Sequence, residues 1–122
     1  MQIGCHGYDH LNWRGADDAT LRRELHDGRA AIEDVIGQAI SSASTPFGAV
    51  DRRAVDAAKQ AGFTALFTSS GGFAVAEHGL VPRNSIRAGF NPARDLPLLA
   101  GAAARAQAAF YDRARRVKYR FY

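Results

Sequence analysis

The sequence predicts an α/β fold in which helices flank an open parallel sheet. Two observations support this prediction: short segments of strand-like composition alternate with segments of helical periodicity, and the helical segments are bounded by capping residues. The chain has 122 residues, of which 47% are apolar and 23% charged, so it has the composition of one globular domain and not of a disordered chain. We therefore expect residues 1–122 to form a single domain.

The first strand and the first helix are separated by a loop rich in polar and aromatic residues. Residues 1–5 form a short apolar stretch with the length of a strand, and the loop follows through Gly15. Asp17 and Asp18 offer an N-cap, and Gly37 supplies the C-terminal stop of a helix. The expected buried face of this helix carries Leu21, Leu25, Ile32, Val35 and Ile36.

A second strand and helix unit follows. Residues 39–44 are small and suit a strand that ends at the turn of residues 45–48, where Pro46 and Gly48 interrupt the pattern. Asp51 caps the next helix, which stops at Gly62. The buried face of that helix is expected to carry Ala54, Val55 and Ala58.

The C-terminal half predicts two more strands and a long helix. Residues 63–68 are rich in β-branched and aromatic residues, residues 69–72 form a glycine turn, and residues 80–86 suit a short strand. Residues 92–116 have the pattern of one long helix, so that residues 93–122 would be a C-terminal helix and a basic tail. Its expected apolar face includes Leu96, Leu99, Ala103 and Phe110.

The positive charge of the chain is concentrated in this tail. The formal net charge is +4, and residues 105–122 hold six basic side chains against the single acidic Asp112. Basic residues interleaved with aromatic ones can bind a nucleic-acid backbone and stack on bases. The more common origin of such a pattern is a solvated helix face that runs into a tail, so we do not expect nucleic acid as the partner.

Two further features restrict the setting of the chain. Cys5 is the single cysteine, which excludes an intramolecular disulfide. No apolar run approaches the ~20 residues of a membrane span, and residues 1–20 lack the pattern of a signal peptide. The default expectation is a cytoplasmic chain without a membrane partner, although a domain of a longer secreted precursor would have the same pattern.

The most informative stretch contains two histidines. His6 and His10 are four residues apart, so their imidazoles can point the same way and supply two nitrogens to a divalent metal such as zinc. A carboxylate and water would be needed to complete the site. Two polar loop residues without a ligand are an equally good interpretation of the spacing alone, and Asp9 is close enough to be a ligand or to orient one.

The neighbouring candidates carry less weight. His26 is expected to be an exposed helical residue, whereas His78 precedes a predicted strand and is a candidate general acid. Cys5 would point to the opposite face of a strand from His6, which makes it a small core residue.

The order of these motifs resembles that of the polysaccharide deacetylases of the NodB homology group, carbohydrate esterase family 4. The resemblance covers roughly residues 1–90. It rests on the histidine pair after a strand, the helix to Gly37, the Pro46-Phe47-Gly48 turn, and the Leu80-Val81-Pro82-Arg83 segment.

This resemblance implies a partial (β/α) barrel and the hydrolysis of N- or O-acetyl groups on carbohydrate polymers. It implies that His6 and His10 bind a divalent metal, with zinc the expected ion, and that the Phe47 backbone N–H is the oxyanion donor. His78 is a candidate for the catalytic acid by its position alone, because the family's Leu-x-His motif for that acid has no counterpart here and His78-Gly79-Leu80 runs in the reverse order. On the same resemblance, the acetylated polymer would contact Tyr8, Trp13 and Pro46.

The chain also departs from the family pattern. The family's first motif, Thr-Phe-Asp-Asp-Gly, which supplies the base and the aspartate ligand, has no counterpart before His6, and Ser44 stands where the family has an arginine. The chain thus resembles the later part of such a domain, inactive by itself. Alternatives are a noncatalytic carbohydrate- or metal-binding protein, or an anionic-polymer binder that uses the tail. An open sheet edge would also favour a homo-oligomer.

Overall fold

The sheet is parallel and has three strands in the order β1, β2, β3. The computed structural model describes residues 1–71, 80–101, 105–107, 109–110, 113–114 and 117. Its elements in chain order are α1 (Asp18–Arg22), the π-helical turn η1 (Arg23–Asp27), α2 (Gly28–Ile36), β1 (Ser42–Ser44), the 3₁₀ turn η2 (Pro46–Gly48), α3 (Arg52–Gln60), β2 (Ala65–Thr68), β3 (Leu80–Pro82) and α4 (Pro92–Ala100). The predicted α/β class with an open parallel sheet is confirmed.

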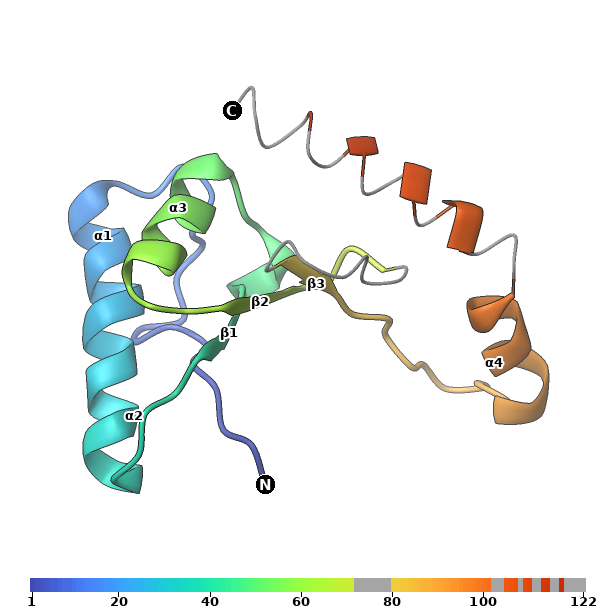
Figure 1. Cartoon of the computed structure of the whole chain (residues 1–122), viewed down its shortest axis with the longest axis horizontal. Helices are drawn as coiled ribbons and strands as arrows, with labels where there is room; N and C mark the ends of the chain where they lie inside the picture. Colours follow the sequence, from blue (N-terminus) through green and yellow to red (C-terminus); the bar gives the residue numbers. More distant parts are fainter. Residues whose placement is uncertain (72–79, 102–104, 108, 111–112, 115–116, 118–122) are drawn as a thin grey trace.

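The segments α1, η1 and α2 form one continuous helical rod with the predicted ends (Figure 1). Asp17 caps the start by accepting the Thr20 N–H, and Gly37 ends the rod with a φ of 67°. In the π-helical turn the Gly28 N–H pairs with the Arg23 carbonyl, five residues back.

The buried stripe of this rod departs from the prediction at one position. Leu21 and Leu25 are buried, and Ile32 and Ile36 pack against the core, as expected. The prediction for Val35 is wrong, because its side chain is 85% exposed. A stripe that passes through residues 28, 32 and 36 at four-residue steps leaves position 35 to one side.

The predicted strand at residues 1–5 is reduced to one bridge. Only Cys5 pairs with the sheet, opposite Ala43, through the Cys5 N–H to the Ser42 carbonyl at 2.9 Å and the Ser44 N–H to the Cys5 carbonyl at 2.8 Å. The predicted strand at 80–86 is also shorter, since β3 ends at Pro82, which has no N–H for a ladder. The two expectations were therefore right in position and too long in extent.

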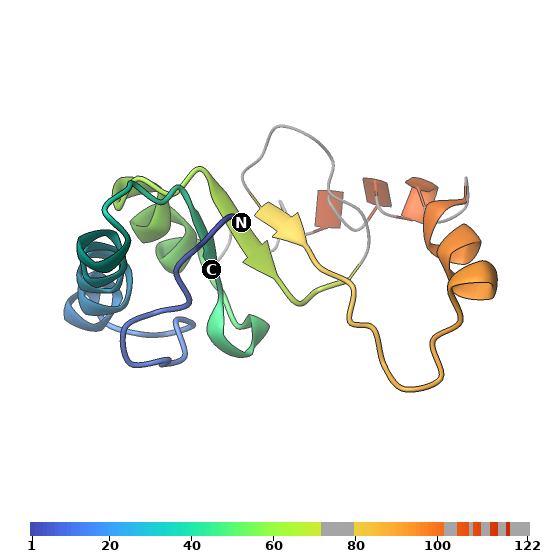
Figure 2. The ribbon, with the colours of Figure 1, turned by 90° about the horizontal axis from the view of Figure 1, so that it is seen from below.

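The core lies between the helices and one face of the sheet. Figures 1 and 2 show α1, α2 and α3 on the same side of the strands. The predicted face of α3 is confirmed. The buried apolar residues are Cys5, Trp13, Leu21, Leu25, Ile40, Ala43, Val50, Ala54, Val55, Ala58, Ala61, Phe63 and Leu66.

The prediction of one uninterrupted helix over residues 92–116 is wrong, because the helix breaks at Gly101, although the described residues 105–107, 109–110 and 113–114 are again helical. Helix α4 ends at Ala100, and Gly101 has extended backbone with a ψ of 165°. Leu96 and Leu98 of α4 are exposed, and Figure 2 shows α4 away from the sheet, so this helix does not cover the strands. Within the described ranges, no helix has both the length and the apolar character that crossing a bilayer requires.

Candidate functional site

The loop that follows Cys5 carries His6 beside the end of β1. The Nδ1 atom of His6 lies 2.9 Å from the Ser44 carbonyl oxygen and 2.7 Å from the Ser44 hydroxyl. When Nδ1 carries the proton it donates to the carbonyl, and the Nε2 lone pair is then free for a ligand. Ser44, which stands where the family has an arginine, therefore orients the first imidazole.

The second imidazole converges on the first. His10 Nε2 lies 3.2 Å from His6 Nε2, and both side chains are exposed. The His10 ring also makes an edge contact with the Phe47 ring, with 4.8 Å between the centroids. The structure thus brings together three of the residues that the sequence singled out.

Two of these three residues have a strained backbone. Among the described residues, His10 and Phe47 are the non-glycine residues with positive φ, each at 57°. A side chain in this left-handed region costs about 1–2 kcal/mol. Such strain tends to gather at binding and catalytic sites, and here the two strained residues touch.

The two imidazoles fit one part of a metal site. Zinc binds nitrogen at about 2.0–2.1 Å in tetrahedral geometry, which separates two nitrogen ligands by about 3.3 Å. The observed 3.2 Å between the Nε2 atoms matches that separation. In the described part of the chain, however, no group of three or more histidine, cysteine or carboxylate side chains is placed to hold a metal ion. The donor set therefore supplies two ligands and needs a third from elsewhere.

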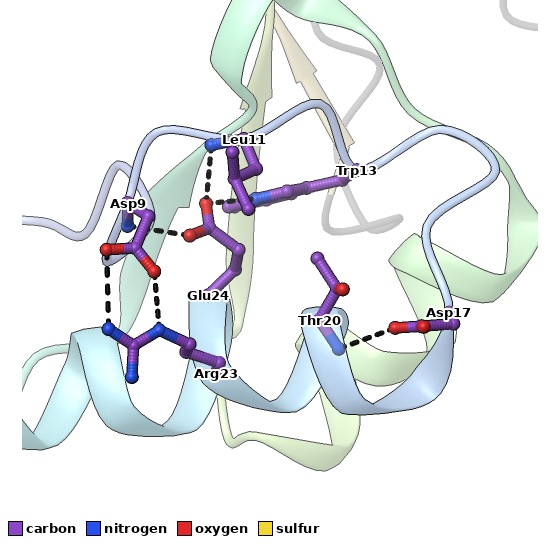
Figure 3. Close-up of polar contacts among 7 residues, drawn as sticks. All are labelled: Asp9, Leu11, Trp13, Asp17, Thr20, Arg23 and Glu24. Carbon is purple, nitrogen blue, oxygen red and sulfur yellow. Dashed lines mark hydrogen bonds and ion pairs between the residues drawn. The ribbon is translucent and has the colours of Figure 1, made fainter.

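Asp9, the candidate third ligand in the sequence, is engaged by a cation. Its carboxylate accepts from Arg23 Nε at 2.5 Å and from Arg23 Nη2 at 3.4 Å (Figure 3). The hydrogen bond from Arg23 holds the pKa of Asp9 below its ordinary value. The Arg23 guanidinium also lies 4.3 Å above the centre of the Tyr8 ring. The ion pair between Asp9 and Arg23 thus ties the loop to the helix.

The expected substrate contacts divide into exposed and buried residues. Tyr8 is half exposed and Phe47 is 71% exposed, so both rings are accessible to a ligand. Trp13 and Pro46 have essentially no exposed surface. The assignment of these two side chains to substrate contact is corrected, because a buried side chain cannot touch a polymer in this conformation.

The remaining histidines and the cysteine are not part of the group formed by His6, His10 and Phe47 in the described structure. His26 is exposed on η1, as expected. His78 lies outside the described residues. Cys5 is buried, and burial raises the pKa of its thiol, which agrees with its expected place in the core.

Sequence reasoning missed Glu24, a carboxylate with no exposed surface. It accepts hydrogen bonds from the Asp9 N–H, the Leu11 N–H and the Trp13 indole. A signal was present, because Glu24 stands three residues after Leu21 and immediately before Leu25, on the apolar stripe of the helix. A charged residue in that stripe indicates a buried partner.

The chain matches the family described as polysaccharide deacetylase over residues 1–66. The matched part is more than half of the 122 residues, and it is a partial domain. It contains both histidines of the pair, the Pro46-Phe47-Gly48 turn and Glu24. The open parallel sheet with helices on one face is consistent with part of a NodB-type barrel. On these grounds, the chain belongs to the polysaccharide deacetylase family.

Proposed function

We propose that this chain supplies the two-histidine half of the divalent-metal centre of a deacetylase for carbohydrate polymers. The observation that carries the proposal is the 3.2 Å separation of the His6 and His10 Nε2 atoms, with His6 Nδ1 held by Ser44. Imidazole nitrogens at this spacing suit zinc, which is the ion that we assign. By itself the chain binds the ion and an acetylated carbohydrate without turnover.

The chemistry divides between the ion and the chain's own residues. A bound divalent ion would polarise the acetyl carbonyl as a Lewis acid. His6 and His10 hold the ion, and Ser44 fixes the orientation of His6. The backbone N–H of Phe47 is proposed as a donor to the carbonyl oxygen, because the strained turn presents this residue beside His10.

The proposed substrate is a polymer that carries N- or O-acetyl groups. The exposed rings of Tyr8 and Phe47 belong to the loop of the histidine pair and to the adjoining turn. Sugar rings present apolar C–H faces that pack on the π faces of aromatic side chains, so these two rings suit a carbohydrate chain. The family membership supports the same class of substrate.

The proposed lack of turnover follows from the carboxylates. Acetyl hydrolysis needs a general base and a third metal ligand. In the described part of the chain Asp9 is paired with Arg23, and Glu24 accepts three hydrogen bonds. A carboxylate from a second chain, or from beyond the described residues, would have to complete the centre.

Zinc binding tests the two-histidine site. In an equilibrium titration we expect saturation near one zinc per chain, with water in the coordination positions that the chain leaves open, and loss of that binding in His6→Ala and His10→Ala. His26→Ala is the matched control, because His26 is an exposed histidine on the helix and is expected to leave the stoichiometry unchanged. Equal zinc content in all four proteins would contradict the proposal.

Acetate release tests the second half of the proposal. With saturating zinc and a chitin oligomer, the chain alone is expected to release no acetate above the background, while binding of the oligomer persists. Acetate release that disappears in His10→Ala would show that the chain carries a complete catalytic centre and would contradict the proposed lack of turnover.

A further inference from the structure

Glu24 is a buried carboxylate that accepts three hydrogen bonds from the loop of residues 6–15, which carries His6 and His10 and is called the histidine loop below. Its Oε1 atom accepts the Asp9 N–H at 2.7 Å, and its Oε2 atom accepts the Leu11 N–H at 2.9 Å and the Trp13 Nε1–H at 3.1 Å. Figure 3 shows the side chain reaching from the helix into this loop. Asp9 and Leu11 are the residues immediately before and after His10. The carboxylate therefore fixes the backbone on both sides of the second imidazole.

The histidine loop packs closely against the helix near Glu24. Gly7 has a φ of 89°, and a Cβ atom there would lie 2.3 Å from Glu24 Oε2. A Cβ atom on Gly28 would lie 3.0 Å from the Tyr8 backbone nitrogen. Gly7 needs glycine for its positive φ and its close approach to Glu24, and a Cβ atom on Gly28 would make tight contacts with the loop backbone.

The three donors also explain why a carboxylate is required. A carboxylate accepts at both oxygens, whereas an amide accepts at one and donates at the other. A buried charge is tolerated when hydrogen bonds satisfy it, and three N–H groups do so here. The residue is thus matched to the loop and not replaceable by its neutral isostere.

We propose that Glu24 is a positioning residue for the metal centre, holding His10 in its strained backbone so that its Nε2 meets that of His6. This inference rests on the proposed function, since it concerns the same two imidazoles. Glu24 acts through the backbone of Asp9 and Leu11 and does not itself touch the ion. Residues that orient metal ligands typically change metal affinity by about 10–100-fold when they are replaced.

The first test compares zinc affinity in Glu24→Gln and in Glu33→Gln. Glu33 is the matched control, because its carboxylate on α2 also accepts a backbone N–H, from Ile40, and a side-chain donor, from Arg29. Glu24→Gln is expected to bind zinc about tenfold or more weakly than wild type, whereas Glu33→Gln keeps the wild-type affinity. Equal affinities in folded Glu24→Gln and wild type, or equal losses in the two variants, would overturn the inference.

The second test needs no metal and separates this inference from the proposed function. In the zinc-free chain, amide hydrogen exchange at Asp9 and Leu11 is expected to be about tenfold or more slower than for unstructured amides. This protection is expected to fall in Glu24→Gln, while the Ser44 amide, bonded to the Cys5 carbonyl, keeps its protection. If wild type fails to bind zinc but shows this exchange pattern, the proposed function fails and the placement of the loop by Glu24 stands.

The wild-type exchange rates decide the inference even where Glu24→Gln does not fold. The hydrogen bonds to Glu24 are supported if the Asp9 and Leu11 amides and the Trp13 indole proton all exchange slowly. Exchange of these three groups at the rates of exposed amides would overturn the inference.

Discussion

At the scale of single residues, the free-energy cost of strained backbone can be measured apart from the loss of side-chain contacts at one of the two strained positions, Phe47. Phe47 and His10 have left-handed backbone and touch through their rings. Because the Phe47 side chain is 71% exposed, its removal takes little packing from the core. The free-energy cost of the left-handed backbone at Phe47 can therefore be measured with little contribution from lost packing.

We predict that Phe47→Gly is more stable than Phe47→Ala by about 1 kcal/mol, because glycine adopts positive φ without the cost of a Cβ atom. Urea denaturation of the two variants gives this difference. Val35, exposed on α2 with ordinary helical backbone, is the control, and there the alanine variant should be the more stable by about 1 kcal/mol. The same sign at both positions would contradict the strained turn.

At the scale of elements, the helical rod is where the histidine loop is supported. Its π-helical turn carries Glu24, and Gly28 follows at the start of α2. A Cβ atom on Gly28 would meet the Gly7 carbonyl carbon at 3.1 Å and Cys5 Sγ at 3.2 Å, as well as the Tyr8 nitrogen. The rod thus presents a backbone surface to the loop.

We predict that Gly28→Ala destabilises the fold by about 1–3 kcal/mol, because overpacking against backbone outweighs the usual gain of alanine in a helix. Thermal or urea unfolding measures the change. Ala31→Gly on the exposed side of α2 reports the ordinary propensity difference and should cost about 1 kcal/mol. Stabilisation by Gly28→Ala would show that the loop does not lie against the helix as described.

The junction between α2 and α3 predicts a pH dependence. Glu33 accepts from Arg29 Nε and from the Ile40 N–H, and Arg29 Nη1 donates to the Ala61 carbonyl. The hydrogen bond from Arg29, followed by that from Ile40, lowers the pKa of Glu33 from its ordinary 4.5. A carboxyl group with a lowered pKa stabilises the folded state fully above 4.5, and that stability is lost as the pH falls through the lower folded value.

We therefore predict that Glu33→Gln is less stable than wild type near neutral pH, and that the difference shrinks as the pH falls below 4.5. Melting temperatures of both proteins across the acid range test this. A difference that stays constant through that range would show that the charge of Glu33 contributes nothing at this junction.

At the scale of the whole molecule, the described sheet has an open edge, and large apolar side chains are exposed in the segment that follows it. Strand β3 is the edge strand of the sheet. Ile86 is 73% exposed and Leu98 is 71% exposed. Open edges and exposed apolar side chains favour association.

That residues 1–122 form one domain stays a prediction from the sequence.

We predict that the chain associates into a homodimer or larger oligomer at micromolar concentration. Sedimentation velocity over a concentration series should show a mass that rises above that of one chain. Urea at a concentration that leaves the helix signal intact is the control for reversible association. A single species of 13.2 kDa at every concentration would contradict this prediction.

Much of the fold could be predicted because it depends on local patterns. The caps at Asp17 and Asp51 and the stop at Gly37 were confirmed, since these residues act through their own backbone or the next few amides. The single helix over 92–116 was wrong because Gly101 leaves helical geometry. Local signals fix where elements begin more securely than how far they continue.

The sequence by itself determined the class of the fold, the family and the residues of the histidine pair, because periodicity, caps and motif spacing lie along the chain. Only the tertiary structure decided that the imidazole nitrogens of His6 and His10 meet, that Trp13 is buried, and that Glu24 holds the loop. The contacts of Glu24 join two different elements, and the meeting of His6 and His10 depends on the left-handed backbone of His10 and on Ser44, which holds His6. These contacts depend on packing in three dimensions, which no local pattern encodes.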